Sequence, residues 1–143
     1  MSKLNFIGLS QLLSKNGDQL QQNMLGLIER ISTYWGSNRD LSHQISITLN
    51  DRELEVSIPQ MRFECFSESK LAIHERMLIG EVTFFTPCDG KSKEFHKVFI
   101  DQENYMSFTI YGSEPSIDID YAKNIENYFM NSLIEAAMRA GLI

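Results

Sequence analysis

Apolar residues recur at helical spacing near the N-terminus of the chain. The main stripe comprises Leu20, Met24, Leu27, Ile28, Ile31 and Tyr34 or Trp35. Residues three and four apart share one face of a helix, so the stripe predicts a helix from about Asp18 to Tyr34, closed near Gly36. Asp18 followed by Gln21 has the pattern of a capping box. A shorter helix over residues 9–13 is expected to end at Gly17 in a left-handed conformation.

The pattern then changes to the alternation of β-strands. Apolar and polar residues alternate over residues 45–49 and again over 54–58, and Asn50-Asp51-Arg52 between them has turn composition. The two runs therefore predict a hairpin, with Glu53 and Glu55 on its solvent face. Residues 61–65 continue the alternation in the opposite phase, which predicts a bulge or a new strand after Pro59-Gln60. Pro59 lacks a donor for the ladder and is expected at a sheet edge.

Residues 67–77 allow two interpretations, a short helix capped by Ser67 or a loop, and we favour the helix. Three later runs, 78–86, 94–100 and 105–111, have strand composition, and Pro87-Cys88-Asp89-Gly90 is a strong turn signal between the first two. The gaps are shorter than the dozen or so residues that a parallel crossover needs. These strands are therefore expected to form an antiparallel meander.

A second stripe of mainly apolar residues at helical spacing lies near the C-terminus. It comprises Tyr121, Ile125, Tyr128, Phe129, Leu133, Ala136, Ala137 and Ala140. Asp118 or Asp120 is expected to cap this helix, and Gly141 to end it. The order helix, strands, short helix, strands, helix predicts an α+β fold, with an antiparallel sheet of five to six strands flanked by N-terminal and C-terminal helices. Residues 1–143 are expected to form a single domain.

Composition excludes several classes of protein. The 143 residues are 43% hydrophobic and include 15 aromatic side chains, which argues against disorder. No apolar run approaches the roughly 18 residues of a membrane span, and no secretory signal is recognisable. Only Cys65 and Cys88 are present, so we expect reduced thiols and a cytoplasmic location. The net charge of −6 argues against general nucleic-acid binding.

Most of that charge lies near the C-terminus. Residues 101–143 hold seven acids and two bases, a net charge of −5, and the stretch from Asp101 to Ala122 contains no base. We expect this acidic surface to meet a basic protein partner, because such a patch steers association. The candidate partner-binding residues are Asp101, Glu103, Glu114, Asp118 and Asp120.

Aromatic residues are concentrated in the predicted meander, with seven of the 15 between residues 84 and 111. Alternation places Phe84 and Phe85 on opposite faces of their strand and Phe95 and Phe99 on one common face, so this half of the sheet is apolar on both sides. Aromatic and Met enrichment is typical of interface cores. The candidate residues for self-association or client binding are Phe85, Phe95, Phe99, Tyr105, Tyr111, Met130, Ile134 and Met138.

Catalytic and metal-binding patterns are weak. His43, His74 and His96 form no close pair with one another, and Ser67-x-x-Lys70 lacks the companion motifs of its enzyme class. We therefore expect no metal and no cofactor. The enzymatic alternative is a pocket lined by Phe85, Phe99 and Tyr105, in which Cys88 and His96 would face each other across a hairpin and act as nucleophile and base.

The function predicted from the sequence is that of a non-enzymatic, homodimeric, partner-binding accessory protein. In layout the chain is similar to several groups of bacterial secretion chaperones and toxin-immunity proteins, an analogy of architecture only. A chaperone would hold an extended client along its strands, and an immunity protein would present its acids to a basic toxin. The alternatives are a small enzyme or ligand-binding domain, and a structural subunit of a larger assembly.

Overall fold

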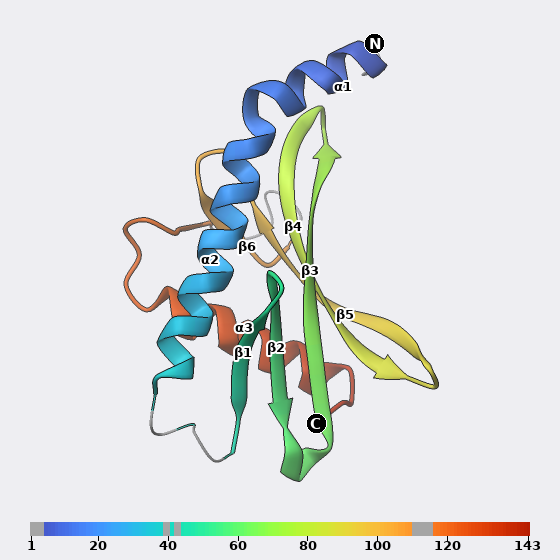
Figure 1. Ribbon diagram of the computed structural model, residues 1–143, viewed down its shortest axis with the longest axis vertical. Helices are drawn as coiled ribbons and strands as arrows, with labels where there is room; N and C mark the ends of the chain where they lie inside the picture. The colour runs from blue at the N-terminus through green and yellow to red at the C-terminus, as the bar shows by residue number, and fades with distance from the viewer. Residues whose placement is uncertain (1–4, 39–40, 42–43, 110–115) are drawn as a thin grey trace.

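The computed structural model describes residues 5–38, 41, 44–109 and 116–143 (Figure 1). Helix α1 (Phe6–Leu12) continues through a π-helical turn at Leu13–Gly17 into helix α2 (Asp18–Gly36). The strands are β1 (Ser46–Asn50), β2 (Glu53–Ile58), β3 (Phe63–His74), β4 (Met77–Cys88), β5 (Lys91–Ile100), β6 (Tyr105–Ser107) and β7 (Ile117–Asp118). Helix α3 (Ile125–Arg139) completes the fold.

One antiparallel sheet contains all seven of these strands, in the order in which they occur along the chain. The α+β class and the meander are therefore confirmed, and β7 brings the strand count one above the predicted upper limit. Two of the hairpins are formed by tight turns with positive φ angles at Asp51–Arg52, between β1 and β2, and at Asp89–Gly90, between β4 and β5. Both turns have the backbone signs of type I′, whose twist matches that of the flanking strands.

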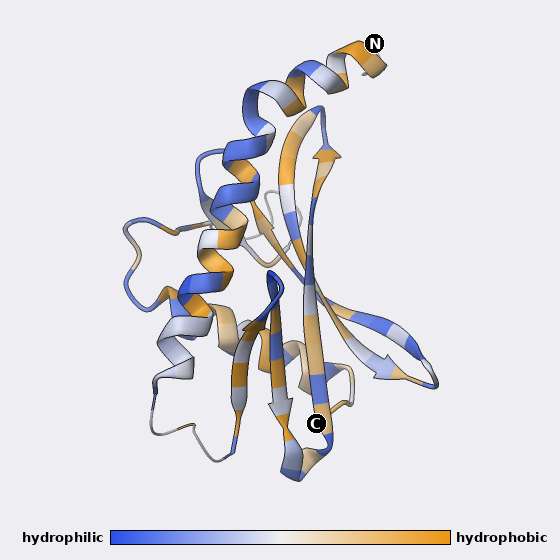
Figure 2. Cartoon of the chain, in the orientation of Figure 1, coloured by the Kyte–Doolittle hydropathy of each residue, from blue (hydrophilic) through white to orange (hydrophobic). Residues whose placement is uncertain are grey.

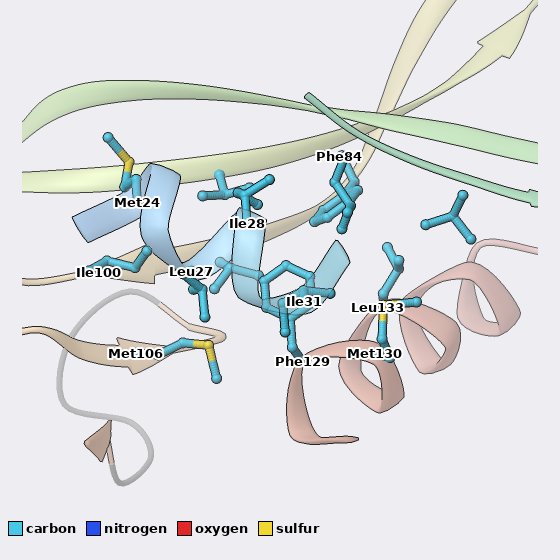
Figure 3. Packing of buried hydrophobic residues seen from close by; sticks show 14 of the residues in the cluster. Met24, Leu27, Ile28, Ile31, Phe84, Ile100, Met106, Phe129, Met130 and Leu133 are labelled. Atoms are coloured by element: carbon cyan, nitrogen blue, oxygen red, sulfur yellow. The ribbon is translucent and has the colours of Figure 1, made fainter. Parts of the chain in front are cut away.

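The hydrophobic core lies between one face of the sheet and the two long helices. Figure 3 shows side chains from α2, α3 and the strands converging there. Phe84 of β4 and Phe129 of α3 are both fully buried, with ring centroids 5.8 Å apart in an edge-to-face arrangement. Gly80 lets α2 approach β4, because a Cβ at this position would lie 2.6 Å from the Met24 sulfur.

The start of α2 differs from the sequence prediction. Gly17 has φ −62°, so it continues the helix instead of ending one, and Asp18 makes no capping hydrogen bond. Gly17 is buried, and a Cβ there would lie 3.5 Å from a methyl carbon of Leu71 on β3. The glycine is thus explained by close packing against the sheet and not by a left-handed turn. Helix α1 exposes Phe6 and Ile7, and Figure 2 colours the beginning of this helix orange.

The predicted short helix in residues 67–77 is wrong. These residues extend β3, which pairs with β4 from Phe66 opposite Phe85 to His74 opposite Met77. The Ser67 hydroxyl caps no helix and instead accepts a 2.8 Å hydrogen bond from the Leu54 N–H. The turn follows at Glu75–Arg76, where both residues have positive φ. The pairing energy of a long ladder outweighs the weak local preference for a helix here.

The predicted caps of α3 are also wrong. The helix begins at Ile125 with Asn124 at its N-cap position, no side chain caps it through a hydrogen bond, and Asp118 lies in β7. A polar contact with α2 fixes this end instead: the Arg30 guanidinium donates to the Glu126 carboxylate at 2.8 Å. The Trp35 indole N–H donates to the Glu126 carbonyl at 3.2 Å. A tertiary contact thus determines where α3 begins.

Candidate functional site: the helix-free face of the sheet

Among the residues that the structure describes, both long helices pack on one face of the sheet, and the opposite face carries no helix. On β3, Phe63 and Cys65 belong to the core cluster, so Glu64, Phe66 and Glu68 point to the opposite side. In β1 and β2, the residues that pair in register with these positions point to the same side of the sheet. We call the resulting set of outward positions the acidic face. It comprises Ser46, Thr48, Asn50, Glu53, Glu55, Ser57, Glu64, Phe66 and Glu68.

The acidic face holds four glutamates and, among its nine described positions, no lysine or arginine. Burial raises the pKa of Glu53 above 4.5, and the charges of Glu68, Glu55 and Asp51 raise it further. Glu68, Glu55 and Asp51 are therefore close enough to Glu53 to repel its carboxylate. A cation bound among them would relieve that repulsion.

A hollow of about 300 Å³ opens on the acidic face between the first three strands and Pro87. Glu55 and Glu64 contribute carboxylates to its lining, and Phe66 contributes an aromatic ring. The Glu55 carboxylate also accepts a hydrogen bond from the Asn50 side chain at 3.1 Å. Phe66 stacks on Phe85 at a centroid distance of 5.6 Å and an interplanar angle of 23°. Both rings are only half-buried, so apolar surface lies beside the two carboxylates.

Farther along the same side of the sheet, Glu81 occupies a different environment. Its side chain is 5% exposed, and its carboxylate lies 3.2 Å from His74 Nε2, 3.7 Å from Lys70 Nζ and 3.9 Å from Lys97 Nζ. The His74 ring also contacts Phe99 edge-on at 6.1 Å. The two lysines and the His74 ring surround this buried carboxylate, so Glu81 is already partnered within the protein.

The structure brings four of the five predicted acidic residues together at the β6–β7 edge, and Glu114 lies outside the described residues. Asp101 accepts hydrogen bonds from the backbone N–H groups of Glu103 and Tyr105 at 2.9 and 3.0 Å. Asp118 accepts one from the Asp120 N–H at 3.0 Å, and Asp120 accepts one from the Asn104 side chain at 3.1 Å. Three of these acids thus shape turns, which leaves them less free to bind a partner.

The predicted self-association residues do not form one surface. Phe85, Phe99 and Tyr105 share the helix-free face, and Phe99 is only 4% exposed. The prediction that Phe95 and Phe99 share a face is wrong, because a bulge in β5 turns Phe95 toward the core, 6.0 Å from the Phe63 ring. On α3, Met130 and Ile134 pack against the core and Met138 is exposed. Tyr111 lies outside the described residues.

Cys88 and His96 do not face each other, in contrast to the enzymatic alternative. The tight turn pairs Cys88 with Lys91, and His96 pairs with Phe84, four residues back along β4. At 3.4 Å per residue the two side chains are separated by roughly 13 Å along the ladder. His96 instead lies 3.1 Å from the Ser132 hydroxyl, between the rings of Phe84 and Phe108. A Cys88–His96 nucleophile and base pair is thus excluded in this conformation.

The two thiols are expected to react very differently. Cys65 is 3% exposed, and burial raises the pKa of its thiol to about 12, whereas Cys88 is exposed at the end of β4. Titration of the folded protein with a thiol-reactive dye should modify Cys88 within minutes, and Cys65 only after denaturant is added. The Cys88→Ser variant should show no fast phase. Two fast equivalents in the native wild type would contradict the burial of Cys65.

Sequence reasoning missed Glu64 and Glu68 as members of the site. Their alternation with Cys65 and Ser67 was a usable signal, but assigning residues 67–77 to a helix removed Glu68 from the sheet. Among the described residues, no group of three or more His, Cys, Asp or Glu could hold a metal ion, and no helix is long and apolar enough to cross a membrane. Comparisons of the chain with protein-family models, curated proteins and solved structures gave no match.

Proposed function

We propose that the protein is a non-enzymatic accessory protein that binds a basic protein partner on its acidic face. The observation that carries the proposal is the hollow lined by Glu55, Glu64 and Phe66, within a set of nine outward positions that holds four glutamates and no lysine or arginine. An arginine or lysine side chain matches this hollow. Its cation would meet the two carboxylates and its aliphatic stem would lie against the aromatic ring.

The form of the acidic face favours a folded partner over an extended client. Its hollow of about 300 Å³ suits single side chains, and the surrounding positions are short polar residues such as Ser46, Thr48 and Ser57. Several basic side chains of a folded partner can meet the four glutamates at once, which raises the rate of association. This is the mode of a toxin-neutralising immunity protein, and a secretion-type chaperone is the second form of the proposal.

The test compares two double charge reversals, using a hexa-arginine peptide as the probe. Wild-type protein should bind it with amide shift changes in β2 and β3. Glu64→Lys with Glu68→Lys should weaken binding by about tenfold or more, since each close ion pair contributes up to roughly 1 kcal/mol. Glu29→Lys with Glu135→Lys is the matched control, because it makes the same charge change at exposed positions on α2 and α3.

An equal loss in both double variants would show that only net charge matters, and the proposal would fail. It would also fail if the shift changes mapped to the β6–β7 edge, and if reversing Asp118 and Asp120 weakened binding more than reversing Glu64 and Glu68. Arginine should bind more tightly than lysine in a parallel titration with a hexa-lysine peptide, because the guanidinium stacks on aromatic rings.

A further inference from the structure

The two edges of the sheet are not equivalent. At the β1 edge, the end of α2 lies close to the strand, since a Cβ on Gly36 would be 3.6 Å from the Ile47 carbonyl oxygen. At the other end of the sheet, the pairs between β5 and β6 among the described residues involve Phe99 and Ile100 of β5. Within the part of the chain that the structure describes, no strand pairs with the outer edge of residues 91–98. Figure 1 shows the β4–β5 hairpin projecting from the body of the protein.

A hollow of about 470 Å³ lies along this unpaired edge. Residues 94–97 of β5 form one side, and the end of α3 forms the other, with Ala136, Arg139 and Ala140. The two alanines are small, so the helix leaves room beside the strand. Phe95 and Phe108 contribute half-buried aromatic surface. A groove between an edge strand and a helix is the geometry in which an extended peptide adds to a sheet.

The register indicates which backbone groups face the groove. Cys88 and Lys91 flank a two-residue turn and form a hydrogen-bonded pair with each other. Hydrogen-bonded and non-hydrogen-bonded pairs then alternate along β5, so the N–H and C=O groups of Ser92 and Glu94 point away from β4. Beyond the bulge, the same alternation makes the N–H and C=O groups of Lys97 point away from β4 as well. These residues can therefore pair with an incoming strand without losing a bond to β4.

The charges in and near the groove favour a negatively charged peptide. Among the charged residues, Lys97, Arg139 and Glu94 line the groove, and Lys91 and Lys93 lie on β5 toward the hairpin turn. Lys97 already contacts the carboxylates of Glu81 and Glu94, at 3.9 and 3.8 Å, so Arg139 is the main attraction for a carboxylate within the groove. Lysines on an edge prevent it from pairing with a second copy of itself. The same lysines would attract a strand that carries carboxylates.

We propose that the groove between the β5 edge and α3 binds an extended acidic peptide segment by strand addition. The ligand strand pairs with the outward backbone groups of Ser92 and Glu94, and one of its carboxylates contacts Arg139. Its apolar side chains cover Phe95 and Phe108. This site is separate from the acidic face, so each can fail a test without affecting the other.

The probe is a fluorescent peptide in which glutamate alternates with valine, and the matched control peptide has lysine in place of glutamate. Glu94→Gln removes a like charge and should tighten binding of the acidic peptide by about twofold to fivefold. Glu94→Pro removes the same charge and also one outward N–H, so binding should fall at least tenfold. Proline is tolerated where an edge N–H faces solvent, so the variant should fold, which circular dichroism checks. Arg139→Gln should weaken binding about fivefold.

Backbone amide shifts of the wild-type protein provide a second readout that needs no variant. The largest changes on adding the acidic peptide should fall on Ser92, Glu94 and Lys97, with smaller ones at Lys91 and Lys93, whose amides point toward β4. Equal affinity of Glu94→Pro and Glu94→Gln would overturn the proposal. So would tighter binding of the lysine peptide at this edge, or shift changes confined to the acidic face.

Discussion

Replacing Phe129 by alanine is expected to lower the free energy of unfolding by about 3–5 kcal/mol, the usual cost of truncating a buried phenylalanine. Phe129 is fully buried and contacts Phe84 edge-to-face at 5.8 Å. Its ring lies among side chains from α2, α3 and the sheet (Figure 3), so its loss leaves a cavity that three elements line. Urea unfolding, followed by the fluorescence of Trp35, measures the change.

Tyr128 provides the matched control, because it precedes Phe129 on α3 and is 51% exposed. Tyr128→Ala should cost less than about 1 kcal/mol. Domains of this size have unfolding free energies of roughly 5–15 kcal/mol, so Phe129→Ala should remove a large share of the total. Similar losses in both variants would contradict the packing of α3 described above.

The strands were predictable where alternation and turn signals agreed. The hairpin of β1 and β2 follows from two alternating runs around residues 50–52, and the phase change after Pro59 appears as a 3-10 turn at Pro59–Met61 followed by β3. Arg62, in the left-handed conformation, completes that change of direction. Local sequence contains this information because a strand exposes one face to the core and the other to solvent.

The errors fall where tertiary contacts outweigh local preference. The sequence around Gly17 resembles a helix end, yet the glycine is needed for contact with Leu71. Ser67 resembles a helix cap, yet its hydroxyl accepts the Leu54 N–H of a neighbouring strand. A single extra residue in β5 reversed the direction of Phe95. None of these contacts is visible from sequence neighbours, since each partner lies on another element.

The candidate site was predictable only in part, for the same reason. Alternation placed Glu53 and Glu55 on a solvent face, but recognising the acidic face also required Glu64 and Glu68 at their register opposite β2. The acidic C-terminal stretch drew attention by its charge, and the structure uses Asp101 and Asp118 to accept backbone N–H groups. Net charge along the chain therefore locates carboxylates but does not show which of them are free.

His96 is expected to make the protein less stable at acidic pH. Burial, and after it the positive charge of Arg139, lowers the pKa of His96 from 6.5 to about 4. The unfolded chain therefore binds a proton below pH 6.5, while the folded protein holds the ring neutral until about pH 4. The contribution of His96 to the free energy of unfolding has its full value above pH 6.5. It declines as the pH falls and is lost by about pH 4. The total corresponds to about 3 kcal/mol.

His96→Asn is the variant that isolates this effect, because asparagine does not titrate. Urea unfolding at several pH values between 7 and 4 should give a shallower loss of stability for the variant, by up to about 1.4 kcal/mol per pH unit. His74→Asn serves as the control, since the His74 ring lies beside the Glu81 carboxylate on the other face of the sheet. Parallel pH profiles for wild type and His96→Asn would mean that the ring is not held neutral between Phe84 and Phe108.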